Sequence, residues 1–351
     1  MMTFKQFARG LEAVPAAVSW YLADLGEAKG KQELFVRQSP QKLKALREHA
    51  IIESAVSSNR IEGVEIDRKR IGTVMFGKQL LQDRAEEEVR GYREALNLIH
   101  GERSSLPVSE ETIKNLHRLA RGDFWDAGKY KEKESNIIER RPDGTSSIRF
   151  KTVPAEETPR FIKGLIEAWN AAIEEKQVHP VIAMAAFNLD FLCIHPFRDG
   201  NGRVSRLLLL LQCYHLGFEV GRYISLERLI EENKERYYET LALSSEGWHE
   251  GTHNPWHYIG YVCYILKSAY REFEERIGRL EGQRGEKTAM IMGAIKKAPG
   301  RFSVDDLRRE CPGVSVDMIR RVLKDLQAEG RVECLGRGPR AVWQKIDDAA
   351  N

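Results

Sequence analysis

The residues best suited to chemistry stand together between His195 and Arg206, in the run His-Pro-Phe-Arg-Asp-Gly-Asn-Gly-Arg-Val-Ser-Arg. Pro196 pushes the residue before it out of the α region, so the apolar helix that precedes it is predicted to end near His195. Gly200 and Gly202 allow the backbone of the following turn to come close to a ligand. A second apolar helix is predicted to begin near Gly202, and its first amide groups form an anion site.

Charged side chains around this anion site indicate which anion it suits. Arg203 and Arg206 are three residues apart and therefore share one face of the predicted helix. Two guanidiniums beside a helix N-terminus suit a polyphosphate better than a single carboxylate. Asp199 is placed to hold Mg²⁺ against those phosphates, and His195 is placed to accept a proton from an attacking hydroxyl. Each residue alone has an ordinary structural explanation, but together they predict a phosphate-handling active site.

The same run resembles the signature of the Fic family, HPFx(D/E)GNGRxxR, and matches it at every defined position. The resemblance covers roughly residues 15–275 and implies transfer of AMP from ATP to a hydroxyl of a target protein. It implies that His195 is the general base and that Asp199 binds Mg²⁺. The residues that it implies for nucleotide binding are Gly200, Asn201, Gly202, Arg203, Ser205 and Arg206, with Arg206 on the γ-phosphate.

A second motif lies upstream, at Ser58-Asn-Arg-Ile-Glu62-Gly63. It resembles the inhibitory motif (S/T)xxxE(G/N) of the same family. The resemblance implies that Glu62 pairs with Arg206 and denies that guanidinium to the γ-phosphate, with Ser58 and Gly63 completing the motif. The alternative is an ordinary helix end, at which a glycine follows a surface glutamate.

Two further segments resemble parts of Fic proteins. An Asp-Gly turn between the β-prone runs 136–138 and 148–153 predicts a hairpin, which stands where the family has a flap that pairs with the target segment. Ile137 and Ile138 are the flap residues expected to contact the target. This hairpin departs from common versions, with Lys131 where Arg is frequent. In the Tyr-Tyr-Glu-Thr-Leu run, Tyr237 is the candidate for the adenine side of the site. The alternative is a packed core tyrosine, a role expected for Tyr238 more than for Tyr237.

A mostly helical scaffold must position these side chains. Apolar residues at three- and four-residue spacing predict helices over residues 41–58, 85–99, 110–119, 154–175, 179–194 and 202–216. The hairpin is the main strand signal before residue 300. We therefore predict an all-α Fic fold with a small β-hairpin. It would comprise an N-terminal helical region, 1–100, that bears the motif 58–63, and a catalytic core, 101–282.

The C-terminal part of the chain differs in charge. Residues 284–345 contain 14 Lys and Arg against 8 Asp and Glu, a net charge of +6, against −3 for the rest of the chain. Helices predicted at 287–296, 304–310 and 315–327, with strands at 331–335 and 341–346, resemble a winged helix-turn-helix domain over 284–346. The third helix would bring Asp317, Arg320, Arg321 and Lys324 to a major groove, and Arg337 and Arg340 would reach phosphates. The alternative is a module that binds protein or dimerises, so a homodimer is a further possibility.

Composition excludes several classes of protein. The 351 residues include 55 Lys and Arg against 52 Asp and Glu, which fits neither a wholly basic nucleic-acid coat nor a disordered acidic chain. The N-terminus has no signal-peptide pattern, and the longest apolar run, residues 207–211, is far shorter than the roughly 20 residues that cross a bilayer. The five cysteines are scattered and never form a CxxC pair, which disfavours disulfides and zinc. We therefore expect a cytoplasmic protein without membrane association.

The predicted function is that of a protein adenylyltransferase with Mg²⁺ as cofactor and ATP as co-substrate. Its target would be a Ser, Thr or Tyr hydroxyl of an unidentified protein, or of the chain itself. One alternative is a Fic enzyme that mainly removes AMP or transfers another nucleotide or a phosphate group, because residues 195–206 recognise phosphates and not the base. An alternative from another class is a nucleotide-sensing DNA-binding regulator. His195 argues against it, since mere binding needs no general base.

Overall fold

The computed structural model of the protein describes residues 1–8, 13–38, 40–77, 80–101, 106–140, 144–298, 300–311, 314–336 and 341–346. Side chains are described for the same residues except 34–38, 40–42, 140, 278–286 and 289. The chain folds into two compact units, Met1–Phe273 (unit 1) and Glu274–Asn351 (unit 2). Among the described residues, none of the helices combines the length and the apolarity needed to cross a membrane.

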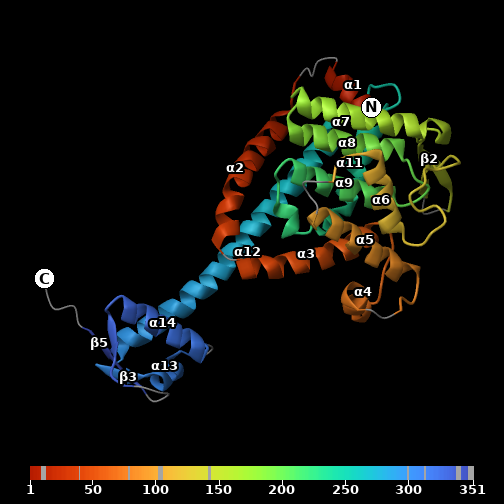
Figure 1. The fold of residues 1–351 in the computed structure, drawn as a ribbon. Coiled ribbons are helices and arrows are strands. Elements are labelled where there is room, and N and C mark those ends of the chain that lie inside the picture. The colour runs from red at the N-terminus through yellow and green to blue at the C-terminus, as the bar shows by residue number, and fades with distance from the viewer. Residues whose placement is uncertain are drawn as a thin grey trace. The chain divides into compact units, whose positions relative to one another are not determined.

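Unit 1 consists of helices and one β-hairpin (Figure 1). The helices are α1 (Met2–Ala8), α2 (Ala16–Gln38), α3 (Pro40–Ile61), α4 (Ile71–Phe76), α5 (Arg84–Gly101), α6 (Glu110–Arg121), α7 (Thr158–Glu174), α8 (Pro180–Ile194), α9 (Asn201–His215), α10 (Leu226–Glu232), α11 (Lys234–Ser245) and α12 (Trp256–Lys297), which continues into unit 2. Short 3-10 turns lie at Arg68–Arg70, Ala155–Glu157 and Val220–Arg222. The hairpin pairs β1 (Ile137–Arg140) with β2 (Ser146–Phe150). The predicted all-α class with a small hairpin is confirmed.

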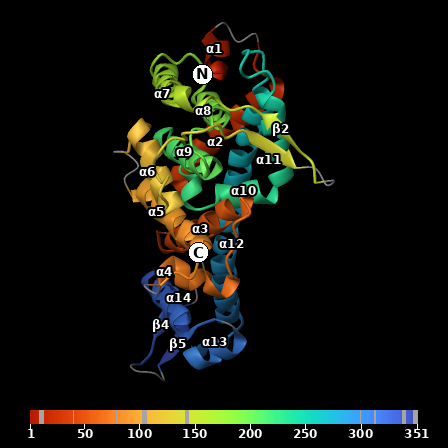
Figure 2. The ribbon, with the colours of Figure 1, turned by 90° about the vertical axis from the view of Figure 1, so that its right-hand side faces the viewer.

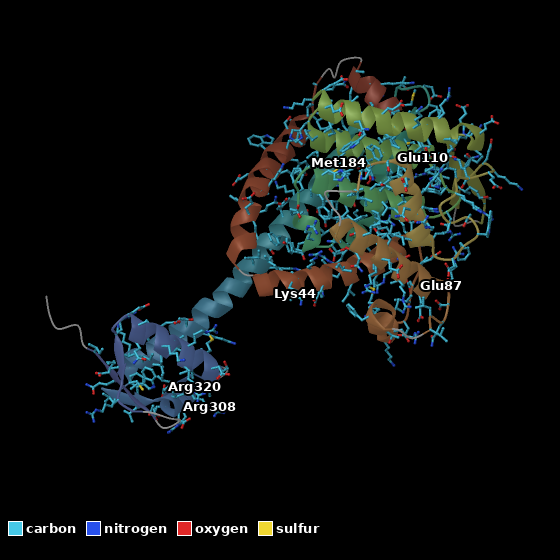
Figure 3. All side chains as sticks on the ribbon, in the orientation of Figure 1. Lys44, Glu87, Glu110, Met184, Arg308 and Arg320 are labelled. Atoms are coloured by element: carbon cyan, nitrogen blue, oxygen red, sulfur yellow. The ribbon has the colours of Figure 1, made fainter. Side chains whose placement is uncertain are left out.

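Helices α8 and α9 lie in the middle of unit 1 (Figures 1 and 2). Nearly all residues of both helices are buried, such as Met184 on α8 (Figure 3). A helix that is buried on nearly all sides is stable only when other elements cover it. Helices α1 and α7 pack against α8, while α3, α5 and α6 pack against α9. The loop between α8 and α9, residues 195–200, is therefore held by a rigid core at both ends.

Helix α12 shows where composition and backbone differ. The composition changes near residues 282–285, yet α12 continues without a break past Gly282 and Gly285 to Lys297. A glycine in a helix interior costs only about 1 kcal/mol relative to alanine, which a helix of 42 residues tolerates. The helix predicted at 287–296 is thus the last part of α12.

Unit 2 combines the end of α12 with short elements. These are β3 (Arg301–Ser303), α13 (Val304–Glu310), α14 (Val316–Ala328), β4 (Val332–Cys334) and β5 (Val342–Lys345). The sheet order is β3-β5-β4, with antiparallel pairs, and its core includes Ile291, Leu323 and Trp343. Strand β3 was not predicted, since three residues are too few to show alternation. Ser315 caps α14 by accepting a hydrogen bond from the Met318 amide. Arg337 and Arg340 lie outside the described residues.

Candidate functional site

A cavity of about 380 Å³ opens at the loop between α8 and α9. Its walls come from α8, α9, α11, the end of α3 and the hairpin, which are far apart in the chain. The predicted site residues that line it are Glu62, Ile137, Ile138, His195, Gly202 and Tyr237. Packing of the helices therefore brings both sequence motifs, the hairpin and the Tyr-Tyr segment to one place.

His195 stands at the C-terminal end of α8, where the helix stops. Its amide donates to the Phe191 carbonyl (2.9 Å), and its backbone adopts the left-handed conformation, with φ +52° and ψ +62°. This conformation is uncommon for a residue with a side chain, and Pro196 prevents the helix from continuing. Burial, together with the positive charge of Lys131, lowers the pKa of His195 to about 4. The imidazole is therefore neutral at pH 7, as a general base must be.

The turn after His195 is closed by the side chain of Asn201. Its Oδ1 accepts from the Phe197 amide (2.8 Å) and its Nδ2 donates to the Phe197 carbonyl (2.7 Å). Ser205, also buried, donates to the Gly202 carbonyl (2.9 Å). Both side chains are thus engaged with the backbone of the turn and of α9. Gly200 has φ +82°, a conformation that glycine adopts without strain.

The first turn of α9 is the place of the expected anion site. The Val204 amide donates to the Gly200 carbonyl (3.0 Å). Within the described part of the chain, the amides of Asn201, Gly202 and Arg203 have no hydrogen-bond partner. Unpartnered amides at the positive end of a helix dipole attract an anion. Glycine at position 202 keeps the space beside these amides open. A Cβ there would overlap Oε1 of Glu62, the carboxylate that now lies in this space.

Arg206 is held by the Ser58–Gly63 motif. Its Nε donates to Ser58 Oγ (2.9 Å), and its Nη2 donates to the Ser58 carbonyl (2.9 Å) and to Glu62 Oε1 (2.8 Å). Burial by itself would lower the pKa of this guanidinium, but the charge and hydrogen bond of Glu62, together with Tyr237 and Tyr92, raise it. Gly63 ends α3 with φ +80°, and its amide donates to the Arg60 carbonyl (2.9 Å), which turns the chain directly after Glu62. The expected contact between Glu62 and Arg206 is present in the structure.

Arg203 is almost fully buried and is engaged with protein groups. Its Nη1 lies 2.9 Å from Glu88 Oε2 and donates to the Asn59 side chain (3.3 Å) and the Ala120 carbonyl (3.3 Å). Glu88, on α5, is equally buried and also pairs with Arg121 on α6 (2.9 Å). A buried carboxylate between guanidiniums keeps them fixed and neutralises part of their charge. Arg203 thus supports the turn from behind and does not line the cavity.

Asp199 is half-exposed at the edge of the site. Its Oδ2 lies 3.0 Å from Arg121 Nη1 and 3.1 Å from Arg84 Nη2, and its Oδ1 accepts from the Gly200 amide (2.6 Å). Burial acts to raise the pKa of this carboxyl, but Arg121 and Arg203 outweigh burial and lower it. The carboxylate is therefore ionised at neutral pH and accessible. Such a carboxylate fits Mg²⁺, which binds one or two carboxylates together with substrate phosphates.

The two tyrosines of α11 differ in burial. Tyr237 is 2% exposed and packs against Tyr258 and Tyr261, whereas Tyr238 is half-buried and donates to the Ile61 carbonyl (3.2 Å). The expectation that Tyr238 is the core residue is therefore wrong. In a helix, adjacent residues point about 100° apart, and only packing decides which of them faces inward. Both line the cavity.

The hairpin carries paired apolar side chains. Ile138 faces Ile148 across the two strands, and they are 59% and 55% exposed. The bulge between Ile137 and Ile138 shifts the register there, and both isoleucines line the cavity. Arg149, on β2, also lines the cavity, and its buried Nε has no hydrogen-bond partner in the described part of the chain.

Sequence reasoning missed the residues that support the motif from other helices. Arg84, Glu88 and Arg121 stand in segments without a motif. Asn59 lies within the Ser58–Gly63 motif and Arg149 within the hairpin, but neither of them was given a role from the sequence. The one signal was the spacing of Arg84 and Glu88, which favours an ion pair on a helix. That pair normally lies on the surface, and nothing in the local sequence shows that Glu88 is buried.

The comparisons with known proteins agree with this geometry. Residues 107–213 match the Fic/DOC family. Among curated proteins, a Protein adenylyltransferase Fic of Nematostella vectensis is 26% identical over 216 residues, 58% of this chain and 45% of that protein. A protein of the same name from Drosophila persimilis is 23% identical over 218 residues, 60% of this chain and 40% of that one. The chain thus spans less than half the length of these curated relatives.

Solved structures share the fold. A Fic family protein from Desulfovibrio desulfuricans G20 has a TM-score of 0.61 at 21% identity, covering 97% of this chain and 98% of that chain. A Fic domain containing signaling protein from Bacteroides thetaiotaomicron VPI-5482 has a TM-score of 0.59 at 23% identity, covering 74% of this chain and 97% of that one. Residues 107–213 therefore match the Fic/DOC family, within a fold that solved Fic proteins share.

Proposed function

We propose that the chain is a protein adenylyltransferase, which transfers AMP from ATP to a hydroxyl of a protein, and that Glu62 restrains it. The observation that carries this proposal is the cavity in which His195, the open amides of α9 and the Glu62–Arg206 pair meet. These groups provide a base, an anion site and a carboxylate in the place of an anion. The names of the curated relatives support the same activity.

In the proposed reaction, neutral His195 takes the proton from the attacking hydroxyl. The hydroxyl oxygen forms a bond to the α-phosphorus of ATP, and the bond from that phosphorus to the α,β-bridging oxygen breaks. Pyrophosphate leaves with the electron pair. The amides of α9 and the Arg206 guanidinium stabilise negative charge on the phosphates. Arg203 and Asn201 keep the turn in shape for this, since their side chains bond to protein groups around it.

Mg²⁺ is the cofactor that we propose, with Asp199 as its protein ligand. When bound, the ion would neutralise phosphate charge. Arg84 and Arg121 hold the Asp199 carboxylate at the edge of the turn in the structure described here. Among the described residues, no cluster of three or more His, Cys, Asp or Glu could hold a metal, so phosphates would complete the coordination.

The decisive experiment compares ATP labelled on the α-phosphate with ATP labelled on the γ-phosphate. We expect the α-label, and not the γ-label, to become attached to protein, with the chain itself as the first target to examine. Attachment of the γ-label would indicate phosphate transfer instead. Loss of a previously attached α-label faster than its addition would indicate AMP removal. Labelled GTP, CTP and UTP test the donor, and His195→Ala should abolish labelling with ATP binding retained.

A second candidate function concerns unit 2. We propose that it is a winged helix-turn-helix domain that binds duplex DNA through α14. Arg320, Arg321 and Lys324 are exposed on this helix, opposite its buried apolar face, and α13 precedes it across a short turn (Figure 3 labels Arg308 and Arg320). Exposed arginine and lysine on the second helix of such a pair favour contact with a major groove and its phosphates.

DNA binding can be measured on the full chain by fluorescence anisotropy with a duplex of mixed sequence. Affinity should fall as salt rises, and Arg320→Ala and Lys324→Ala should each weaken binding and reduce the salt slope by about one. Arg160→Ala, an exposed arginine of unit 1, is the matched control. Binding unaffected by both substitutions in α14 would contradict this proposal. It would also remove the support for a DNA-binding regulator.

A further inference from the structure

Lys131, in the segment between α6 and β1, is a lysine buried beside His195. It is 5% exposed. Its Nζ donates to the Ile194 carbonyl (3.2 Å), and its backbone amide donates to the Pro196 carbonyl (2.9 Å). The two ends of one residue thus hold the residues directly before and after His195.

The same ammonium reaches the base of the hairpin. Lys131 Nζ donates to Thr152 Oγ1 (2.8 Å), and this hydroxyl donates in turn to the Ser135 carbonyl (3.2 Å). The Thr152 amide donates to Asn136 Oδ1 (3.1 Å). Asn136 directly precedes β1, and Thr152 follows β2 by two residues. Lys131 therefore connects the loop of His195 to both strands of the hairpin.

The surroundings of this charge are unusual. Among the described residues, no carboxylate lies within ion-pair distance of Lys131, and its Nζ contacts only neutral oxygens. Glu134 on the same segment acts from farther away, and burial dominates, lowering the pKa of Lys131 to about 8. The negative charges of Glu62 and Asp199 favour protonation of His195, which burial and the charge of Lys131 oppose. An ammonium buried without a counterion is costly, which makes a purely structural role a poor explanation.

We propose that Lys131 is a positioning residue for His195: in its protonated form it fixes the histidine loop against the hairpin base and places a positive charge beside the imidazole. This inference rests on the proposed function of the site. It acts through His195 and not through the nucleotide, because no contact of Lys131 reaches the amides of α9 or Arg206.

The pH dependence follows from the direction of these shifts. Lys131 is protonated below about pH 8 and neutral above it. Hydrogen bonds from a charged donor are roughly twice as strong as neutral ones. The hydrogen bond from Lys131 Nζ to the Ile194 carbonyl therefore weakens as pH rises through 8, and the rate of AMP transfer should fall in the same range. An arginine at this position would stay charged and should not show this loss.

The experiment uses full-length Lys131→Met and Lys131→Arg, with Lys133→Met, an exposed lysine on the same segment, as the matched control. Initial rates of α-label transfer from ATP are measured between pH 6 and 9.5. We expect Lys131→Met to lower kcat at least tenfold with the KM for ATP within about twofold. Lys131→Arg should keep most of the activity at pH 7 and lose the decline above pH 8. The control should match the parent protein.

A second readout does not depend on activity. In a ¹H–¹³C NMR titration of the His195 ring, removal of the neighbouring charge in Lys131→Met should raise the pKa of His195 by about half a unit or more. An unchanged pKa, or an alkaline decline that persists in Lys131→Arg, would overturn the inference. If Lys131→Met does not fold, the pH profile of Lys131→Arg decides. If the parent protein transfers no label, the proposed function fails, whereas the titration still tests Lys131.

Discussion

Arg206 is the residue on which the two sequence motifs meet. Three acceptors surround its guanidinium: the hydroxyl and carbonyl of Ser58 and the carboxylate of Glu62. Ser58 orients the guanidinium without adding charge, so its contacts remain compatible with a bound phosphate. Under the proposed function, Glu62 occupies the direction that a phosphate oxygen would take. The same arginine would then serve either the restraint or the nucleotide, and the balance between them would set the activity.

Glu62→Gly should raise self-labelling from α-labelled ATP. Removal of the carboxylate frees Arg206, and a tenfold gain requires only about 1.4 kcal/mol of productive binding. The measurement is the initial rate at saturating ATP and Mg²⁺. Glu65→Gly, an exposed glutamate just downstream, should leave the rate unchanged. Arg206→Ala in the Glu62→Gly background should cancel the gain. A Glu62→Gly rate no higher than that of the parent protein would reduce Ser58–Gly63 to an ordinary helix end.

Glu88→Gln should destabilise the protein more than a surface change does. The substitution keeps the shape but removes the negative charge that pairs with Arg84, Arg121 and Arg203. Breaking a buried ion pair costs about 3 kcal/mol or more, because a charge is left without its partner. Urea unfolding of the full chain measures the loss, and Glu87→Gln, half-exposed on the same helix, is the control. Equal stability of the two variants would show that the network does not hold the motif.

The packing of helix α5 against helix α6 brings Glu88 of α5 next to Arg121 of α6. Their close approach depends on Gly91 of α5, because a Cβ there would overlap the carbonyl oxygen of Leu119 on α6. Backbone cannot move aside as the end of a side chain can. The distance between these helices, and with it the support of Asp199 by Arg121, therefore depends on one missing methyl group.

Gly91→Ala should lower the free energy of unfolding by about 2 kcal/mol, the usual cost of an added carbon in a packed interior. Alanine favours helix over glycine by about 1 kcal/mol, so a net loss identifies the clash as its cause. Gly101→Ala, at the end of the same helix and without a neighbour within 4 Å of the added carbon, should not be destabilised. Thermal unfolding of both variants makes the comparison, and an equal Tm would mean that the helices can separate without cost.

The whole molecule consists of two units that differ in titratable residues. The sequence contains no histidine after His257, so unit 2 has none. In unit 1, burial lowers the pKa of His100 to about 3 and those of His195 and His253 to about 4. Their pKa in the unfolded chain is about 6.5. Between these values the unfolded chain binds protons that the folded one does not.

Unit 1 should therefore lose stability as pH falls from 6.5 towards 4, while this effect is absent from unit 2. The stability linked to these histidines is fully present above pH 6.5. At pH 5 the free energy of unfolding has fallen by several kcal/mol, because the unfolded chain binds protons there. Hydrogen exchange with mass spectrometry on the full chain, at pH 7.5 and pH 5.0 and corrected for intrinsic rates, assigns protection to each unit. Equal loss of protection in both units would contradict this explanation.

The local part of the site was predictable from the sequence because its physics lies within a few residues. The stop of α8 at His195, the glycine-containing turn after it and the open amides of α9 depend on proline, glycine and helix-end rules that act between neighbours. The same holds for the cap of α14 at Ser315 and for the pairing of β1 with β2. A run of twelve residues contained enough of these rules to predict both the anion site and its place at a helix start.

Tertiary structure decided what surrounds that run. Only packing shows that Glu62 meets Arg206 across 144 residues, that Glu88 lies behind Arg203, and that Lys131 holds both sides of His195. It also decided that Tyr237 is buried more deeply than Tyr238, since either of two adjacent helical residues can face the interior until neighbouring helices are in place. The burial of a residue depends on segments that are distant in the chain. When burial changes, the strength of the residue's electrostatic interactions, its pKa and its partners change as well.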